Sequence, residues 1–130
     1  MNSTNARQPE CSVQKPTILV VEDEVLVRMM VGDRLREDGY AVIEAANAHE
    51  AITVLRSTTH IDLVLTDISM PGAIDGLGLA RLIREEFPSL KVVLASAYYI
   101  MHDEPAAHAF IRKPYNFTEV TQRIRDLIVE

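Results

Sequence analysis

Polar residues that act on phosphate or metal stand where strand-like runs of this sequence end. They are Glu22, Asp23, Asp67, Ser96 and Lys113. In a parallel sheet with neighbouring strands, the three carboxylates would gather close together and raise one another's pKa unless a positive charge intervenes. A hard divalent cation and the Lys113 ammonium group are the two candidates for that charge.

The chemistry of this set favours phosphoryl transfer. An all-oxygen cluster without His or Cys fits Mg²⁺, or alternatively Mn²⁺, better than Zn²⁺. With a cation bound, Asp67 can act as a nucleophile toward a phosphoryl donor and become an aspartyl phosphate. Lys113 could then reach one phosphoryl oxygen, and the Ser96 hydroxyl could donate to the product. Every part that the reaction needs is therefore present in the sequence.

Short apolar runs alternate with longer amphipathic segments after Pro16, which is typical of βα units around a parallel sheet. The runs predict five strands, over residues 17–22, 41–45, 61–66, 91–95 and 108–112. We expect an α/β fold with a doubly wound, five-stranded parallel sheet in the order 2-1-3-4-5, of the flavodoxin-like class. Ligands bind such sheets at the carboxyl ends of the strands, where the polar residues stand.

The segments between the strands carry apolar residues at helical spacing. They predict a helix over 24–38, two further helices around 48–55 and 79–87, and a last helix that opens at Asn116. The interval 97–107 is too short for an average helix of about 11 residues and its turns. Pro105 disfavours the α conformation in the residue before it. We therefore expect a degenerate fourth helix of one or two turns, or an irregular loop.

Composition excludes several classes of protein. The net charge of −6 argues against a nucleic-acid surface, which needs a basic face. The sequence has no apolar run near the roughly 20 residues that span a membrane. Cys11 has no disulfide partner, which indicates a reducing compartment. We expect a cytoplasmic protein with a flexible tail over residues 1–15 and one domain over 16–130.

Four motifs, in this order and spacing, resemble the receiver domain of two-component response regulators. They are VVEDE at 20–24, LVLTDISMPG at 63–72, ASA at 95–97 and FIRKPY at 110–115. The resemblance covers about residues 16–130. It implies that Glu22 and Asp23 are the acidic metal pair and that Asp67 is the phosphoacceptor. It also implies that Ser96 is the switch hydroxyl, that Lys113 is the family's lysine, and that the backbone carbonyl of Ser69 is the third metal ligand.

The sequence departs from the common receiver pattern in three places. Phe110 stands where many receivers have a switch tyrosine, which leaves an aromatic rotamer switch without a hydroxyl. The short segment 97–107 resembles that of a subgroup of single-domain receivers with a degenerate fourth helix, and it is also a candidate surface for a homodimer. Tyr98 and Tyr115 flank the site.

The resemblance implies a stand-alone response regulator rather than an enzyme with an external substrate. It would take a phosphoryl group from a histidine kinase or histidine phosphotransfer protein onto Asp67, and then switch partner binding or relay the group. Because the chain ends directly after the last predicted helix, we expect no output domain. The alternative is a non-phosphorylated pseudo-receiver that acts as an interaction module. A phosphatase with an aspartate nucleophile would need a second acid two residues after Asp67, where Ser69 stands.

Overall fold

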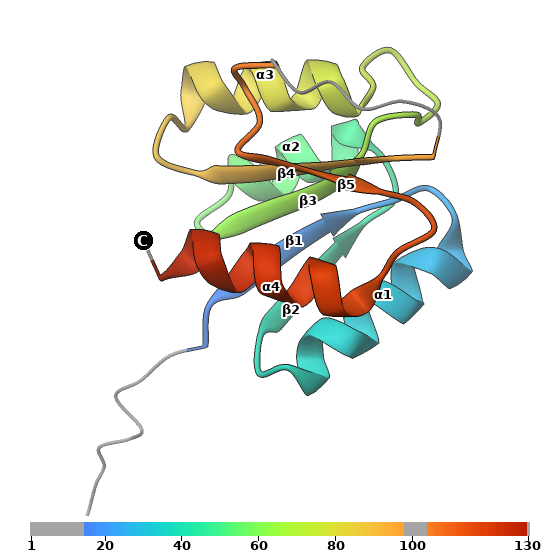
Figure 1. The fold of residues 1–130 in the computed structure, drawn as a ribbon. Helices are drawn as coiled ribbons and strands as arrows, with labels where there is room; N and C mark the ends of the chain where they lie inside the picture. Colours follow the sequence, from blue (N-terminus) through green and yellow to red (C-terminus); the bar gives the residue numbers. More distant parts are fainter. Residues whose placement is uncertain (1–14, 98–103, 130) are drawn as a thin grey trace, which may run out of the picture.

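The computed structural model describes residues 15–97 and 104–129. Figure 1 shows a central sheet with helices on both faces. The elements in chain order are β1 (Thr17–Val21), α1 (Val25–Glu37), β2 (Ala41–Ala45), α2 (Ala48–Leu55), β3 (Leu63–Asp67), α3 (Gly76–Glu86), β4 (Lys91–Ser96), β5 (Ala109–Arg112) and α4 (Phe117–Ile128).

The sheet confirms the predicted fold class. Its five strands are parallel and lie in the order β2-β1-β3-β4-β5. Helices α2 and α3 cover one face, and α1 and α4 cover the other (Figure 1). This is the doubly wound flavodoxin-like arrangement, in which the reversal of strand order next to β1 opens a crevice at the carboxyl ends of the strands.

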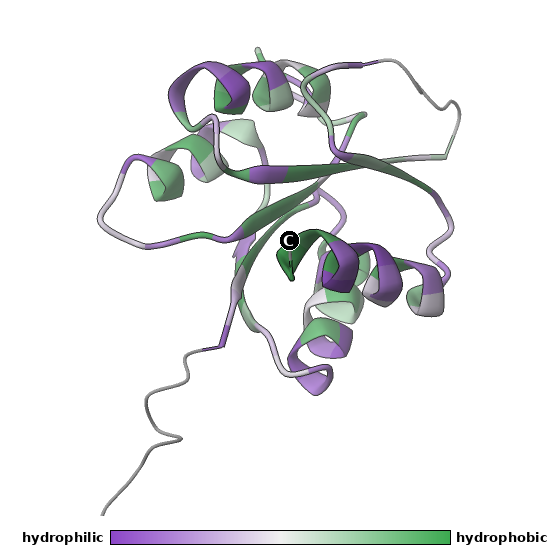
Figure 2. Ribbon diagram, turned by 60° about the vertical axis from the view of Figure 1, so that its left-hand side comes forward, coloured by the Kyte–Doolittle hydropathy of each residue, from purple (hydrophilic) through white to green (hydrophobic). Residues whose placement is uncertain are grey.

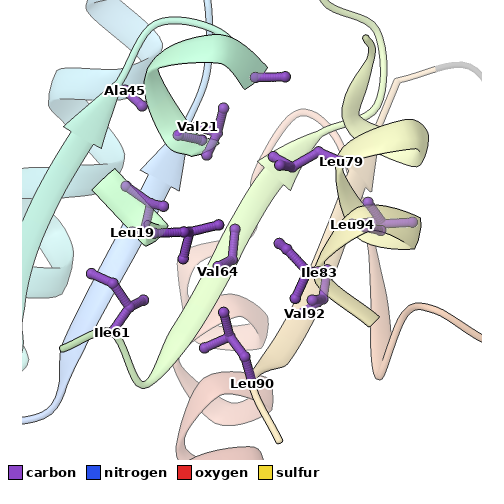
Figure 3. Close-up of a cluster of buried hydrophobic side chains, with 14 of the residues drawn as sticks. Leu19, Val21, Ala45, Ile61, Val64, Leu79, Ile83, Leu90, Val92 and Leu94 are labelled. Carbon is purple, nitrogen blue, oxygen red and sulfur yellow. The ribbon is translucent and has the colours of Figure 1, made fainter. Parts of the chain in front are cut away.

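Two apolar cores hold the layers together, one on each face of the sheet. Figure 3 shows the first core, in which Leu79 and Ile83 of α3 pack over Leu19, Val64 and Val92 of the strands. On the opposite face, α1 and α4 pack on the alternate residues of the same strands. Each large apolar side chain that is fully buried stabilises the fold by about 1.5–3 kcal/mol. Figure 2 shows the corresponding pattern, with mostly hydrophobic strands and helices that alternate between hydrophilic and hydrophobic residues.

Most element boundaries differ from the predictions by one or two residues, and α3 begins three residues earlier than predicted. The third strand begins at Leu63 rather than residue 61, and it extends to include Asp67, which pairs with Ala95. Helix α3 begins at Gly76, because the side chain of Asp75 caps it by accepting from the Gly78 N–H at 2.9 Å. The predicted cap of the last helix is confirmed.

The segment after β4 contains no helix among its described residues, which are 97 and 104–107. Residues 104–107 form a turn in which the Ala107 N–H donates to Glu104 O at 3.2 Å. The Glu104 carboxylate accepts from Arg81 Nη2 of α3 at 2.8 Å, which ties the turn to that helix. The predictions for residues 98–103, including Tyr98 and the dimer surface, and for the tail up to residue 14 lie outside the described residues. No helix in the described part of the chain is long and apolar enough to cross a membrane.

Candidate functional site

The register of the sheet brings the predicted site residues to one edge. Val21 of β1 lies opposite Thr66 of β3, so that Glu22 and Asp67 follow at the carboxyl ends of neighbouring strands. Ser96 ends β4, and its backbone carbonyl accepts from the Lys113 N–H at 2.9 Å. Parallel pairing therefore gathers residues that are up to 91 positions apart in the sequence.

Glu22, Asp23 and Asp67 form a compact acidic cluster. Each offers one carboxylate oxygen, and these oxygens lie within 4.8 Å of one another. Glu22 and Asp67 are buried, at 1% and 6% exposed, and Asp23 is half-buried. Oxygen ligands of this kind are those that Mg²⁺ prefers, and it commonly uses one or two carboxylates together with phosphate. The donor set of this cluster therefore fits Mg²⁺.

Lys113 supplies the positive charge of the site. Its Nζ donates to Glu22 Oε1 at 2.8 Å and lies 3.5 Å from Asp67 Oδ2. The same Nζ lies 5.7 Å from the ring centroid of half-buried Tyr115, within cation–π range. The ammonium group is thus positioned beside the two buried carboxylates by the turn that follows β5.

Burial and charge shift the ionisation of the site. Burial raises the pKa of the Glu22 carboxyl, although the hydrogen bond from Lys113 acts in the other direction. Burial likewise raises the pKa of Asp67 against the attraction of Lys113, and the nearby charge of Asp23 adds to the increase. Burial acts to lower the pKa of Lys113, but the hydrogen bond to Glu22 and the neighbouring carboxylates raise it overall. A metal-free site therefore has more negative charge than its surroundings stabilise.

An open cleft of about 290 Å³ gives access to the cluster. It is lined by Asp23, Glu24, Asp67, Ser69, Ala97 and Lys113. The Ser69 N–H donates to the Asp67 carboxylate, and Ser69 itself is exposed. A phosphoryl donor can therefore reach Asp67 from solvent, while the base of the cluster stays buried.

The loop after Asp67 depends on two glycines. Gly72 has a φ of 112°, which side-chain-bearing residues rarely adopt, and it follows Pro71, which cannot donate to a ladder. Gly76 lies directly against the end of β3, since a Cβ at this position would be 1.9 Å from Asp67 O. The sequence reasoning missed Gly76. A glycine directly after the helix-capping Asp75 was the available signal.

The two predicted switch residues lie on neighbouring strands. Ser96 is buried at the end of β4. Phe110 of β5 is opposite Leu94 of β4, is half-buried and packs against the core under α3. Ser96 therefore lies at the edge of the sheet that bears Asp67, whereas Phe110 lies deeper in the sheet.

The sequence reasoning also missed Arg28, which contacts the turn that carries Glu22, and Glu44, which contacts Arg28. Arg28 Nη1 donates to the backbone carbonyl of Glu22 at 2.8 Å, and Arg28 Nε donates to Glu44 Oε1 at 3.2 Å. The available signal was the charged residue at the fourth position of the strand AVIEA, whose other side chains are apolar.

The sheet order and the acidic cluster at its carboxyl edge define a doubly wound α/β domain whose cluster fits a divalent cation. A model of the response regulator receiver domain matches residues 18–125. The chain belongs to this family. Its members are signalling domains of two-component systems that take phosphoryl groups from histidine kinases, and Mg²⁺ binding is typical of them.

Known proteins with similar sequence or structure agree with this assignment. The chain is 37% identical over 120 residues to the aerobic respiration control protein ArcA of Escherichia coli (strain K12), which covers 89% of this chain and 50% of ArcA. It is 33% identical over 121 residues to the probable transcriptional regulator ycf27 of Cyanophora paradoxa, covering 89% and 49%. The structure of response regulator TrrA from Thermotoga maritima, in complex with Mg²⁺-BeF, has a TM-score of 0.79 and 36% identity, and the match covers 86% of this chain and 98% of that one.

The chain spans about half the length of the curated relatives that it matches. The names of these relatives describe transcriptional regulation for one and respiration control for the other. The expected absence of a nucleic-acid partner is therefore untested by the comparisons.

Proposed function

We propose that this chain is a phosphorylation-controlled receiver in which Asp67 accepts a phosphoryl group from a histidine kinase or histidine phosphotransfer protein. The observation that carries the proposal is the placement of Asp67 at the end of β3. Its carboxylate opens into a cleft, lies within the acidic cluster and faces the Lys113 ammonium group at 3.5 Å. This arrangement combines a nucleophile with the charges that neutralise a phosphoryl group.

In the proposed reaction, an Asp67 carboxylate oxygen attacks the phosphorus. The N–P bond of the donor phosphohistidine breaks as the O–P bond forms, and the electron pair returns to the imidazole. Lys113 neutralises one phosphoryl oxygen, and the Ser96 hydroxyl donates a hydrogen bond to another. A Mg²⁺ ion held by the carboxylates of the acidic cluster and the Ser69 carbonyl would supply further charge neutralisation.

The surface beside the cleft supports a protein as phosphoryl donor. Helix α1 begins directly after Glu24, which lines the cleft, and its first two turns carry large apolar side chains exposed to solvent. The exposed fractions are 55% for Val25, 74% for Leu26, 48% for Met29 and 57% for Met30. Contiguous exposed apolar residues mark interaction surfaces, and a small phosphoryl donor would not need one.

The phosphorylated form would signal through Ser96 and Phe110 by changing partner binding, or would pass the phosphoryl group on. We expect the chain to do this as a stand-alone receiver in the cytoplasm. The single cysteine of the sequence and the short interval between the β4 and β5 segments support this expectation.

Intact-mass analysis tests the proposal. The full chain is incubated with Mg²⁺ and a small acyl phosphate, and we expect it to gain the mass of one phosphoryl group. The Asp67→Asn variant should gain none, because it lacks the nucleophile. Asp126→Asn is the matched control, since Asp126 is exposed on α4 and outside the cleft, and it should be phosphorylated as the wild type is.

Failure of the wild type to gain mass would overturn the proposal and favour the alternative, an interaction module that works without phosphorylation. Equal gain by the wild type and Asp67→Asn would place the phosphoryl group on another residue. Repeating the transfer with a phosphorylated histidine kinase as donor extends the test to a protein partner.

A further inference from the structure

Arg28 reaches from α1 to the backbone of the turn that carries the acidic pair. Its Nη1 donates to Glu22 O at 2.8 Å while its Nε donates to Glu44 Oε1 of β2 at 3.2 Å. The side chains of Arg28 and Glu44 are 16% and 25% exposed. A planar guanidinium group with several donors in a fixed geometry can make both contacts at once, whereas a lysine ammonium group concentrates its charge at one point.

The peptide groups around Glu22 are held from two sides. The Glu22 N–H donates to Ala45 O at the end of β2 at 3.0 Å, and the Glu22 carbonyl accepts from Arg28. The Glu22 carboxylate meanwhile accepts from Lys113 Nζ and from the Glu24 N–H at 3.3 Å. The Arg28 contact therefore completes the attachment of this turn to α1, the helix that follows it.

Glu44 is itself held in a space built for it. Its second oxygen, Oε2, accepts from Arg36 Nη2 at 3.2 Å, so that two arginines of α1 hold one carboxylate. Gly32 lies between them in the helix, and a Cβ there would be 3.0 Å from Glu44 Oε2. Glycine destabilises a helix interior, but its lack of a side chain here leaves the room that the Glu44 carboxylate occupies.

We propose that Arg28, oriented by Glu44, is a positioning residue for cation binding. It holds the Glu22 carbonyl and thereby the turn from which the Glu22 and Asp23 carboxylates reach the cation. The inference rests on the proposed function, because it assigns a role toward the cation that the proposed phosphoryl transfer uses. Groups that orient metal ligands without binding the metal typically contribute 10- to 100-fold in affinity, which is about the size of effect expected here.

Isothermal titration of the full chain with Mg²⁺, without any phosphoryl donor, tests this inference. Arg28→Lys keeps the charge but cannot bridge Glu22 O and Glu44, and we expect Mg²⁺ affinity to fall about 10-fold. Arg36→Lys is the matched control: Arg36 contacts the same Glu44 carboxylate, but its Nη1 donates to Asp33 of the same helix rather than to the acidic turn. This control should bind Mg²⁺ as the wild type does.

Glu44→Gln provides a second variant, which keeps an acceptor oxygen but weakens the hold on Arg28. We expect a smaller loss of affinity, and the double variant with Arg28→Lys should lose no more than Arg28→Lys does by itself, because the two residues act as one unit. Thermal unfolding without Mg²⁺ checks that each variant is folded, and saturating Mg²⁺ should restore the phosphorylation rate of Arg28→Lys.

Wild-type affinity in Arg28→Lys, or an equal loss in Arg36→Lys, would overturn the inference while leaving phosphorylation of Asp67 intact. Conversely, a selective loss in Arg28→Lys would support it even if Asp67 accepted no phosphoryl group. The failure of one proposal is therefore distinguishable from the failure of the other.

Discussion

Two pairs of a basic side chain and a carboxylate in this domain have similarly short contacts, but the pKa of the carboxyl group is shifted in opposite directions. Lys113 and Glu22 meet at 2.8 Å in the site, with side chains 14% and 1% exposed. Arg56 and Glu86 meet at 2.5 Å at the C-terminal ends of α2 and α3, with side chains 55% and 39% exposed. Burial raises the pKa of Glu22 despite its partner, whereas the hydrogen bond from Arg56 lowers the pKa of Glu86.

The difference shows that desolvation, more than contact distance, decides the ionisation of the site. A buried carboxylate loses its hydration, and a single ammonium group shared among several acids does not replace it. An exposed pair keeps its water and gains little from its partner. The fold thus maintains a cluster with unneutralised negative charge next to an open cleft, which favours binding of a divalent cation.

Removing the buried cation should have the largest effect. Lys113→Met keeps much of the side-chain length but leaves Glu22 and Asp67 without the ammonium group. We expect the free energy of unfolding of the metal-free protein to fall by about 3 kcal/mol near neutral pH, as for other broken buried pairs. Urea unfolding followed by circular dichroism measures this loss, and added Mg²⁺ should recover part of it.

Lys91→Met is the control for Lys113→Met. Lys91 is also half-buried, but it begins β4 and therefore lies at the end of that strand away from Ser96 and the acidic cluster. It should change stability much less. The loss in Lys113→Met should also shrink at acid pH, where protonated carboxyl groups need no cation. A loss that is independent of pH would indicate that Lys113 stabilises the fold by packing rather than by charge.

Neutralising one buried acid should have a smaller effect of the opposite sign. The folded-state pKa of Asp67 is raised above 3.8, so folding favours its protonated form, and the associated stability is lost as pH rises through the folded pKa. Asp67→Asn stays neutral at every pH. We therefore expect the metal-free variant to be about 1 kcal/mol more stable than the wild type near neutral pH.

The advantage of Asp67→Asn should disappear as pH falls below the ordinary range of an aspartate, because the wild-type side chain is then protonated as well. Urea unfolding at both pH values, with a chelator present, gives the comparison. If the variant were less stable than the wild type near neutral pH, the attraction between Asp67 and Lys113 would outweigh the cost of burial.

The sequence predicted the parts of the molecule that depend on local pattern and on parallel pairing. The apolar run that precedes Asp67 predicted a fully buried strand, and the polar residues at the strand ends predicted which side chains would meet. Asn116 predicted the cap of the last helix, and its side chain accepts from the Glu119 N–H at 3.2 Å. These inferences need only periodicity, capping chemistry and strand order.

Contacts between different elements that depend on how the elements pack were not predictable in the same way. Arg28 and Glu44 lie 16 positions apart on different elements, and their meeting depends on how α1 packs across β2. The close approach of Gly76 to Asp67 O likewise depends on the angle at which α3 leaves the loop. Such features need three-dimensional packing, for which strand order and helical spacing are too coarse.

Breaking the exposed pair should have the smallest effect. Glu86→Gln removes the carboxylate charge that pairs with Arg56, yet both side chains are exposed to water. We expect the urea midpoint to stay at the wild-type value near neutral pH and to be insensitive to added salt. A shift as large as that of Lys113→Met would mean that contact geometry, rather than burial, sets the strength of the two pairs. An unchanged midpoint would instead show that this exposed pair contributes little to stability despite its short contact.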